Sequence, residues 1–189
     1  MDRREILGIL NDYEEAFQDE AATVQRIREL VENHSDCFDR TCIPGHVTGS
    51  AWIVSADLTQ HLLTHHRKLN RWLQVGGHAD GDSSPFNVAL REACEESGMD
   101  RFLPVKNSGR LLPLDIDVHS IPARHSEPEH EHHDLRYLLI ADRAQEITVS
   151  HESHDVRWFT VDQVMSLTDE PGIHRMLRKS NLLLNEMES

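Results

Sequence analysis

The segment from Gly76 to Met99 constrains the fold and chemistry of this chain more than any other. It reads as the end of a strand, a loop rich in glycine and aspartate, and a helix that stops at Gly98. Ser83 or Ser84 can cap this helix, and Pro85 suits its first turn because no hydrogen-bonding amide is lost there. A glycine after the last turn is the usual helix stop. The segment therefore predicts a strand, a loop and a helix of defined length.

Acidic side chains gather on one face of the predicted helix. At 100° per residue, Glu92, Glu95 and Glu96 fall within about 80° of one another. Like charges on one turn repel each other, so their clustering calls for a compensating partner. A hard divalent cation is such a partner, because it prefers oxygen ligands and is often shared with a phosphate-bearing substrate. The opposite face is apolar or small, with Phe86, Leu90, Ala93 and Ser97.

The spacing of this segment resembles the Nudix box, the signature of the Nudix hydrolases. The matching positions are Gly77-x5-Ser83-x7-Arg91-Glu92-Ala93-x-Glu95-Glu96-x-Gly98-Met99. The family has a glutamate where Ser83 stands and a bulky apolar residue where Ala93 stands, while Asp80 and Asp82 lie close to the missing acid. Weaker likeness extends the resemblance over residues 45–170.

This resemblance implies a fold and an activity. The expected fold is α/β (an α+β sandwich), in which a mixed sheet lies between helices, with an added N-terminal helical segment. We expect residues 1–40 to form that extension and residues 41–189 to form the Nudix hydrolase domain. The implied activity is a metal-dependent cleavage of a diphosphate linkage in a nucleoside-diphosphate-X compound or a related phosphorylated metabolite. The implied cofactor is Mg²⁺ or Mn²⁺.

The resemblance also implies roles for single residues. Glu92, Glu95 and Glu96 are the expected catalytic residues and metal ligands, and Glu92 either binds the metal or acts as the base for the attacking water. The carbonyl of Gly76 is a further candidate ligand, because a glycine allows close approach of the backbone. Arg91 is expected to be structural, pairing with an acid and holding the loop.

Histidines around the box widen the choice of metal. His78 is expected either to bind metal or phosphate or to be a loop histidine hydrogen-bonded to backbone. Together with His119, His130 and His132, it makes Zn²⁺ possible. Residues 124–134 are rich in histidine and acid, which fits a metal-binding loop or a solvated hairpin tip. Nudix enzymes often recruit one further carboxylate here, and Glu129, Glu131 and Asp134 are equal candidates.

A basic segment before the box is a candidate for binding substrate. His65, Arg67 and Lys68 can capture phosphate groups, or they can form a solvated turn of an acidic protein. We also assign His119 and His132 to substrate binding. The expected partner is thus a small-molecule diphosphate.

Composition limits the other classes of partner. Asp and Glu number 33 against 19 Lys and Arg, a net charge of −14, which argues against general binding to nucleic acid or to an anionic membrane. No apolar run is long enough for a membrane span, and the first residues lack the apolar core of a signal peptide. Three cysteines indicate reduced thiols and a cytoplasmic location.

The N-terminal region has two features outside the resemblance. The spacing of apolar residues over positions 2–33 predicts a helix. A break between Asp19 and Thr23 would make it a helical hairpin, because both residues are plausible helix caps. Its apolar face is expected to pack on its own domain, or else to form a homodimer or a substrate lid. His34, Cys37, Cys42 and His46 follow, and they fit either a zinc site or unpaired, partly buried thiols, which we favour.

Alternating and apolar runs predict the remaining elements. Strands are expected over residues 45–63, 71–75, 111–121, 132–141, 146–149 and 153–159, and helices over residues 161–167 and from residue 171 onward. Two other functions share the implied fold. One is a ligand-binding sensor or regulator without hydrolysis, which the missing acid at Ser83 favours. The other is an isoprenoid-diphosphate isomerase, for which the sequence carries no selecting motif.

Overall fold

The N-terminal region forms a helical hairpin that packs on the rest of the chain. The computed structural model describes residues 3–124 and 127–187. Helix α1 (Arg3–Ala16), the 3₁₀ turn η1 (Gln18–Glu20) and α2 (Ala21–Asn33) confirm the predicted break. The predicted caps were wrong, because α2 begins at Ala21 without a side-chain cap. The hydroxyl of Tyr13 instead donates to Glu20 at 2.7 Å and stabilises the turn.

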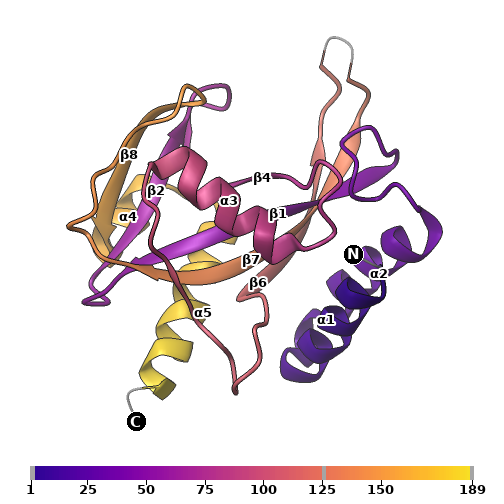
Figure 1. The fold of residues 1–189 in the computed structure, drawn as a ribbon, viewed down its shortest axis with the longest axis horizontal. Coiled ribbons are helices and arrows are strands. Elements are labelled where there is room, and N and C mark those ends of the chain that lie inside the picture. The colour runs from indigo at the N-terminus through magenta and orange to yellow at the C-terminus, as the bar shows by residue number, and fades with distance from the viewer. Residues whose placement is uncertain (1–2, 125–126, 188–189) are drawn as a thin grey trace.

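A mixed sheet forms the centre of the molecule (Figure 1). Its strands are β1 (Gly45–Ser55), β2 (Gln60–His66), β3 (Arg71–Leu73), β4 (Val75–His78), β5 (Leu103–Pro104), β6 (Asp115–Ile121), β7 (His130–Ala141) and β8 (Ser153–Thr160). The order β3-β2-β1-β7-β5 is extended by β4 on β1, β6 on β7 and β8 on β2. Strands β1 and β7 are parallel, and the other pairs are antiparallel. The expected α+β class is confirmed.

Helices cover both faces of this sheet. Figure 1 shows α3 (Pro85–Ser97) lying across the sheet and the α1–α2 hairpin beside it. Side chains of these three helices share one core with Val47, Ala51 and Ile53 of β1. The alternate residues of β1, Trp52 and Val54, pack instead with α4 (Val161–Leu167) and α5 (Pro171–Met187). Because successive side chains of a strand point to opposite faces, β1 separates two cores.

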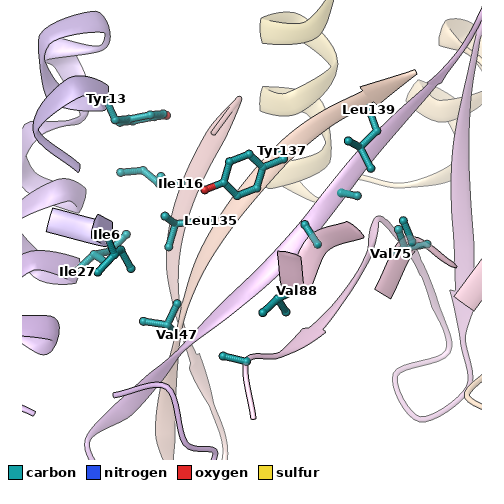
Figure 2. Packing of buried hydrophobic residues seen from close by; sticks show 14 of the residues in the cluster. Ile6, Tyr13, Ile27, Val47, Val75, Val88, Ile116, Leu135, Tyr137 and Leu139 are labelled. Carbon is teal, nitrogen blue, oxygen red and sulfur yellow. The ribbon is translucent and has the colours of Figure 1, made fainter. Parts of the chain in front are cut away.

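The larger core joins the hairpin to the sheet. Figure 2 shows Ile6 and Ile27 of the hairpin near Val47 and Leu135 of the sheet, while Tyr13 lies near Ile116. All of these side chains are at least 98% buried. The expectation that the apolar face of the N-terminal helices packs on its own chain is therefore confirmed.

The face of the sheet covered by α5 also carries a buried ionic network. Arg136 donates to Asp134 at 2.8 Å, to Asp117 at 2.9 Å and to Asp115 at 3.0 Å. Arg175 of α5 donates to Asp115 at 2.7 Å. Asp115 has no exposed surface, so its charge is balanced entirely by these cations and by Lys179. The polar residues that alternate with apolar ones in residues 111–121 therefore line a buried polar region on the face of the sheet covered by α5.

Two strand predictions differ from the structure. Residues 146–149 form no strand; Thr148 packs against Gly98, and its amide donates to the Ser97 carbonyl at 2.8 Å. This segment closes the end of α3, which satisfies its backbone without a strand partner. Strand β6 begins at Asp115 and not at Leu111. Residues 125 and 126 of the polar connection lie outside the described residues. Among the described helices, none has the length and apolar character needed to cross a membrane.

Candidate active site

Helix α3 is positioned by its own ends and by a glycine of β1. The Ser84 side chain accepts a hydrogen bond from the Asn87 amide, and Pro85 occupies the first turn, as the sequence predicts. Gly98 ends the helix at φ 73°, in the left-handed region that glycine adopts without strain. Beneath the helix, a Cβ atom on Gly49 would overlap the Pro85 carbonyl oxygen. The helix can approach the sheet this closely because position 49 lacks a side chain.

Glu96 lies beneath the end of β4. Its Oε1 accepts a hydrogen bond of 2.8 Å from the amide of Gly76, and 7% of the residue is exposed. Burial, helped by the charges of Glu92 and Glu152, raises the pKa of Glu96 to about 7, although the hydrogen bonds from Gly76 and Thr64 oppose this shift. A carboxylate in this position is close to half ionised at neutral pH, so a cation beside it would favour the charged form.

Glu92 and Glu95 lie toward the solvent from Glu96. A Cβ on Gly77 would lie 2.5 Å from Oε1 of Glu92, which places this carboxylate directly against the β4 backbone. Burial raises the pKa of Glu92, Arg91 lowers it, and the charges of Glu95 and Glu152 raise it again. The Glu95 side chain is 58% exposed. The structure thus brings the three predicted carboxylates to one patch beside Gly76, at graded depths.

Arg91 joins the helix to β4. Its Nη2 donates to the carbonyl oxygen of His78 at 2.7 Å. Its Nη1 lies 2.9 Å from Glu92 and 3.4 Å from Glu95. The guanidinium of Arg91 therefore bridges these two carboxylates and offsets their mutual repulsion, and it links the end of β4 to the helix.

Glu152 is a carboxylate of this region that the sequence reasoning missed. It precedes β8, whose first residue, Ser153, pairs with His66 of β2. Its carbonyl accepts a hydrogen bond of 2.9 Å from the Arg67 amide, and its charge acts on Glu92 and Glu96. The side chain is 61% exposed, and its Oε1 lies 3.8 Å from Nε2 of His151. Recognising it requires the pairing of β2 with β8, which single-strand patterns do not reveal.

The carboxylates proposed from the sequence as additional ligands lie elsewhere. Asp134 accepts hydrogen bonds from Thr48, Ser50 and Arg136 in the buried network. Glu131 pairs with Arg26 at 2.6 Å and lies 3.2 Å from His133. Both are occupied by structural partners, and Glu129 is exposed in the connection before β7.

The predicted basic residues are divided between two faces. Arg67 and Lys68 lie in the turn after β2, close to Glu152, where Arg67 donates to the Ser153 carbonyl at 2.9 Å. His65 points to the opposite face and stacks on Trp72, with ring centroids 4.9 Å apart. Of these three residues, Arg67 is the one with contacts beside Glu152, whereas Lys68 lies in the exposed turn that follows it.

The other predicted histidines gather away from the patch. The ring of His78 lies 5.1 Å from His46 and 5.1 Å from His132, and that of His119 lies 5.5 Å from His132. Gly77 faces Glu92, so the next side chain, His78, points to the other side of β4. The structure does not bring His78, His119 and His132 together with the carboxylates of α3.

The four residues that suggested a zinc site near the N-terminal helices also separate. Cys37 is buried in the larger hydrophobic core, and His46 joins the other histidines. His34 and Cys42 remain near each other with Asp36, and the Cys42 thiol donates to Asp36 at 3.5 Å. Cys37, Cys42 and Cys94 are all free thiols, as expected.

Comparison with known proteins gives a family and a fold. A family model described as NUDIX domain matches residues 46–179. No curated protein sequence matches the chain. A Nudix-family hydrolase from Clostridium perfringens is 22% identical, with a TM-score of 0.57, covering 73% of this chain and 97% of that one. A Caenorhabditis elegans Ap4A hydrolase in a binary complex is 15% identical, with a TM-score of 0.57, covering 74% and 98%.

A third solved structure is similar over the same extent. The NUDIX domain of Shewanella oneidensis NrtR, complexed with ADP ribose, is 15% identical, with a TM-score of 0.50, covering 73% of this chain and 87% of that one. Identities this low show a shared fold and leave the substrate of this chain open.

Proposed function

Because this chain belongs to the Nudix family, we propose that it is a metal-dependent hydrolase that cleaves a diphosphate linkage in a nucleoside-diphosphate-X compound or a related phosphorylated metabolite. The observation that carries the proposal is the carboxylate patch of α3, in which Glu96 is hydrogen-bonded to Gly76 and Glu92 lies against Gly77. Ap4A hydrolase and the ADP-ribose-bound domain share the fold, and their named ligands contain such linkages.

The donor atoms of the patch fit Mg²⁺ or Mn²⁺. Carboxylate oxygens are the ligands that hard cations prefer, and the raised pKa values of Glu92 and Glu96 reflect burial and mutual repulsion that a cation would relieve. Glu92, Glu95, Glu96 and the Gly76 carbonyl would hold the ion. When bound, it supplies charge neutralisation at the diphosphate and activation of a water molecule.

The protein groups divide the remaining work. Glu92 either binds the metal or takes the proton of the attacking water, and its raised pKa suits the second role. Glu152 is a second candidate base, since it is exposed beside the patch. Arg91 positions Glu92 through their 2.9 Å contact. Arg67 and Lys68 would bind the substrate phosphates. His65, His119 and His132 remain predictions for substrate binding, and His78 remains a prediction for binding a metal such as Zn²⁺.

A substrate screen with a matched variant pair tests the proposal. The panel contains NDP-sugars, dinucleoside polyphosphates, NADH, ADP-ribose and nucleoside triphosphates, each with Mg²⁺, Mn²⁺ and Zn²⁺. Glu96→Gln should lower turnover by about 100-fold or more while the fold persists, because an amide oxygen can still accept from Gly76. Glu129→Gln, an exposed control, should leave turnover unchanged. Retained turnover in Glu96→Gln would overturn the metal assignment.

A sensor without hydrolysis is the second candidate. It is favoured by Ser83, a buried serine at the position of a family acid, and by the fold shared with a domain that binds ADP ribose. Calorimetry with the same panel separates the two functions. Binding without turnover of any compound would favour the sensor over the hydrolase.

We also propose a cytoplasmic location and a possible homodimer for this protein. The free thiols of Cys37, Cys42 and Cys94 fit a reducing compartment such as the cytoplasm. A homodimer through the N-terminal helices would use the outer, charged face of α1 and α2, because their apolar face is buried within the chain. Sedimentation velocity at several protein concentrations tests this assembly.

A further inference from the structure

Strand pairing brings four histidines together on the sheet face opposite α3. Parallel pairing of β1 with β7 places His46 beside His132, and His130 lies two residues earlier on the same face of β7. His78 comes from the end of β4, which pairs with β1. The ring centroids of His46 lie 5.0 Å from His130 and 4.8 Å from His132. We name this set, His46, His78, His130 and His132, the histidine cluster.

The nitrogens of the histidine cluster lack protein partners. His46 is 1% exposed, and neither of its ring nitrogens has a hydrogen-bond partner. The backbone of Cys42 lies near the ring and raises its pKa, but it forms no hydrogen bond with either nitrogen. Nε2 of His132 is likewise buried and without a partner. A buried polar atom without a partner destabilises the fold, so three such atoms at one point indicate a missing ligand.

The tautomer of His130 is set for ligation. Its Nδ1 lies 2.9 Å from the Pro128 carbonyl oxygen. A carbonyl can only accept, so Nδ1 carries the hydrogen and Nε2 presents its lone pair. In histidines that bind metals, the ring nitrogen that is not a ligand typically donates such a hydrogen bond, which fixes the orientation and the tautomer of the ring.

We propose that His46, His130 and His132 form a second metal site, separate from the carboxylates of α3, that binds Zn²⁺. One ligand nitrogen from each lies within 4.8 Å of the other two. Tetrahedral zinc with nitrogen ligands near 2.0–2.1 Å needs separations of about 3.3 Å, which small side-chain rotations supply. Imidazole favours Zn²⁺ over Mg²⁺, so the two sites select different ions. His78 lies where it can complete the shell, or the fourth position stays open to a water or an anion.

Zinc titration of the untagged full-length chain tests this site. The protein is stripped with a chelator, dialysed into excess Mg²⁺ to occupy the carboxylates, and titrated with Zn²⁺ by calorimetry. We expect about one Zn²⁺ per chain and a rise in the melting temperature on binding. His46→Gln and His132→Gln should each weaken binding beyond the 10- to 100-fold typical of changes outside the ligand set, and should abolish the stabilisation.

Matched variants identify the site that binds. His154→Ala removes an exposed histidine of β8 outside the histidine cluster and should leave zinc affinity unchanged. Cys42→Ser disrupts the group of His34, Asp36 and Cys42 and should also leave it unchanged. Circular dichroism confirms that each variant is folded, and tetrahedral Co²⁺ absorption provides an independent signal of nitrogen ligation. Absence of zinc binding, or binding lost in Cys42→Ser and retained in His46→Gln, would overturn the proposal, whatever the outcome of the hydrolysis assays.

Discussion

At the scale of single residues, the carboxylate patch depends on the lack of a side chain at Gly77. Gly77 leaves room for the Glu92 carboxylate, whose Oε1 would lie 2.5 Å from a Cβ at that position. The helix backbone need not move to relieve this overlap, because the contact is with the end of a flexible side chain. Gly77 is part of the motif in the sequence, and the structure shows that glycine is needed there because Glu92 fills the space of a Cβ atom.

Gly77→Ala should therefore impair catalysis more than folding. We expect kcat/KM to fall by at least about tenfold as Glu92 is displaced, with a loss of stability near 1 kcal/mol. Steady-state kinetics on the substrate found in the screen and urea unfolding measure the two effects. Gly8→Ala, in open space on α1, is the control and should gain up to about 1 kcal/mol without a change in rate. Equal rates for both variants would contradict the account.

His61 gives a pH dependence with a single physical cause. Its ring is fully buried beside Trp52, and burial alone lowers its pKa from 6.5 to about 4. Between these values the unfolded chain binds the proton that the folded chain excludes, so stability falls as the pH drops from 6.5 to 4.

His61→Phe should remove this part of the acid sensitivity. Relative to the parent chain, the variant should gain roughly 3 kcal/mol on going from pH 7 to pH 4, since one pKa unit corresponds to about 1.4 kcal/mol. Urea unfolding at a series of pH values measures the difference between the two proteins. Parallel stability curves would show that His61 binds its proton equally well in the folded and the unfolded chain, which would contradict the lowered pKa. The buried histidines 46, 132 and 133 add similar slopes to both proteins and cancel.

At the scale of elements, the seat of α3 on β1 decides where the carboxylates lie. A Cβ on Gly49 would overlap backbone atoms of α3, and backbone cannot move aside as a side chain can. Gly49→Ala should therefore displace the helix and cost about 2–3 kcal/mol. It should also lower turnover, because Glu96 would lose its hydrogen bond to Gly76. Urea unfolding and kinetics test both effects, and a loss of stability below about 0.5 kcal/mol would mean that the contact between α3 and β1 adapts to the added methyl group.

Local sequence signals predicted these elements well where the determinants are local. The Ser84 cap, Pro85 and Gly98 fix α3, and Thr160 caps α4, which runs from Val161 to Leu167 as predicted. Long-range pairing was not predictable from such signals. The approach of Glu152 to α3 depends on β8 pairing with β2, and the histidine cluster depends on the register of β1 with β7. The sequence predicts a strand over residues 146–149, but among the described residues no strand pairs with this segment.

At the scale of the whole molecule, the sheet separates two kinds of chemistry. One face supports α3 and its carboxylates, and the other carries the histidine cluster, the ionic network around Arg136 and the core under α5. The ionic network lies between the histidines and that apolar core. Breaking it from one side would leave buried charge unpaired, typically at a cost of 3–5 kcal/mol. The ionic network therefore stabilises β7, the strand that carries His130 and His132 of the histidine cluster.

The N-terminal hairpin is expected to be required for folding, although the family match begins only at residue 46. Removing residues 1–40 would strip Ile6, Leu10, Tyr13, Val24 and Ile27, all fully buried, from the core that contains Val47 and Leu135. At about 1.5–3 kcal/mol for each large apolar side chain, the loss is comparable with the whole stability of a typical domain, about 5–15 kcal/mol.

The same deletion also breaks polar contacts between the hairpin and α5. Lys179 of α5 donates to the Tyr13 hydroxyl at 2.8 Å and pairs with Glu20, and both partners would be lost. We therefore expect the chain of residues 41–189 to lose cooperative thermal unfolding and to expose apolar surface, measured by calorimetry and dye binding. Lys179→Met in the full chain is the control for the polar part and should retain a cooperative transition. A truncated chain that melts cooperatively within a few degrees of the full chain would show that residues 1–40 are a dispensable extension.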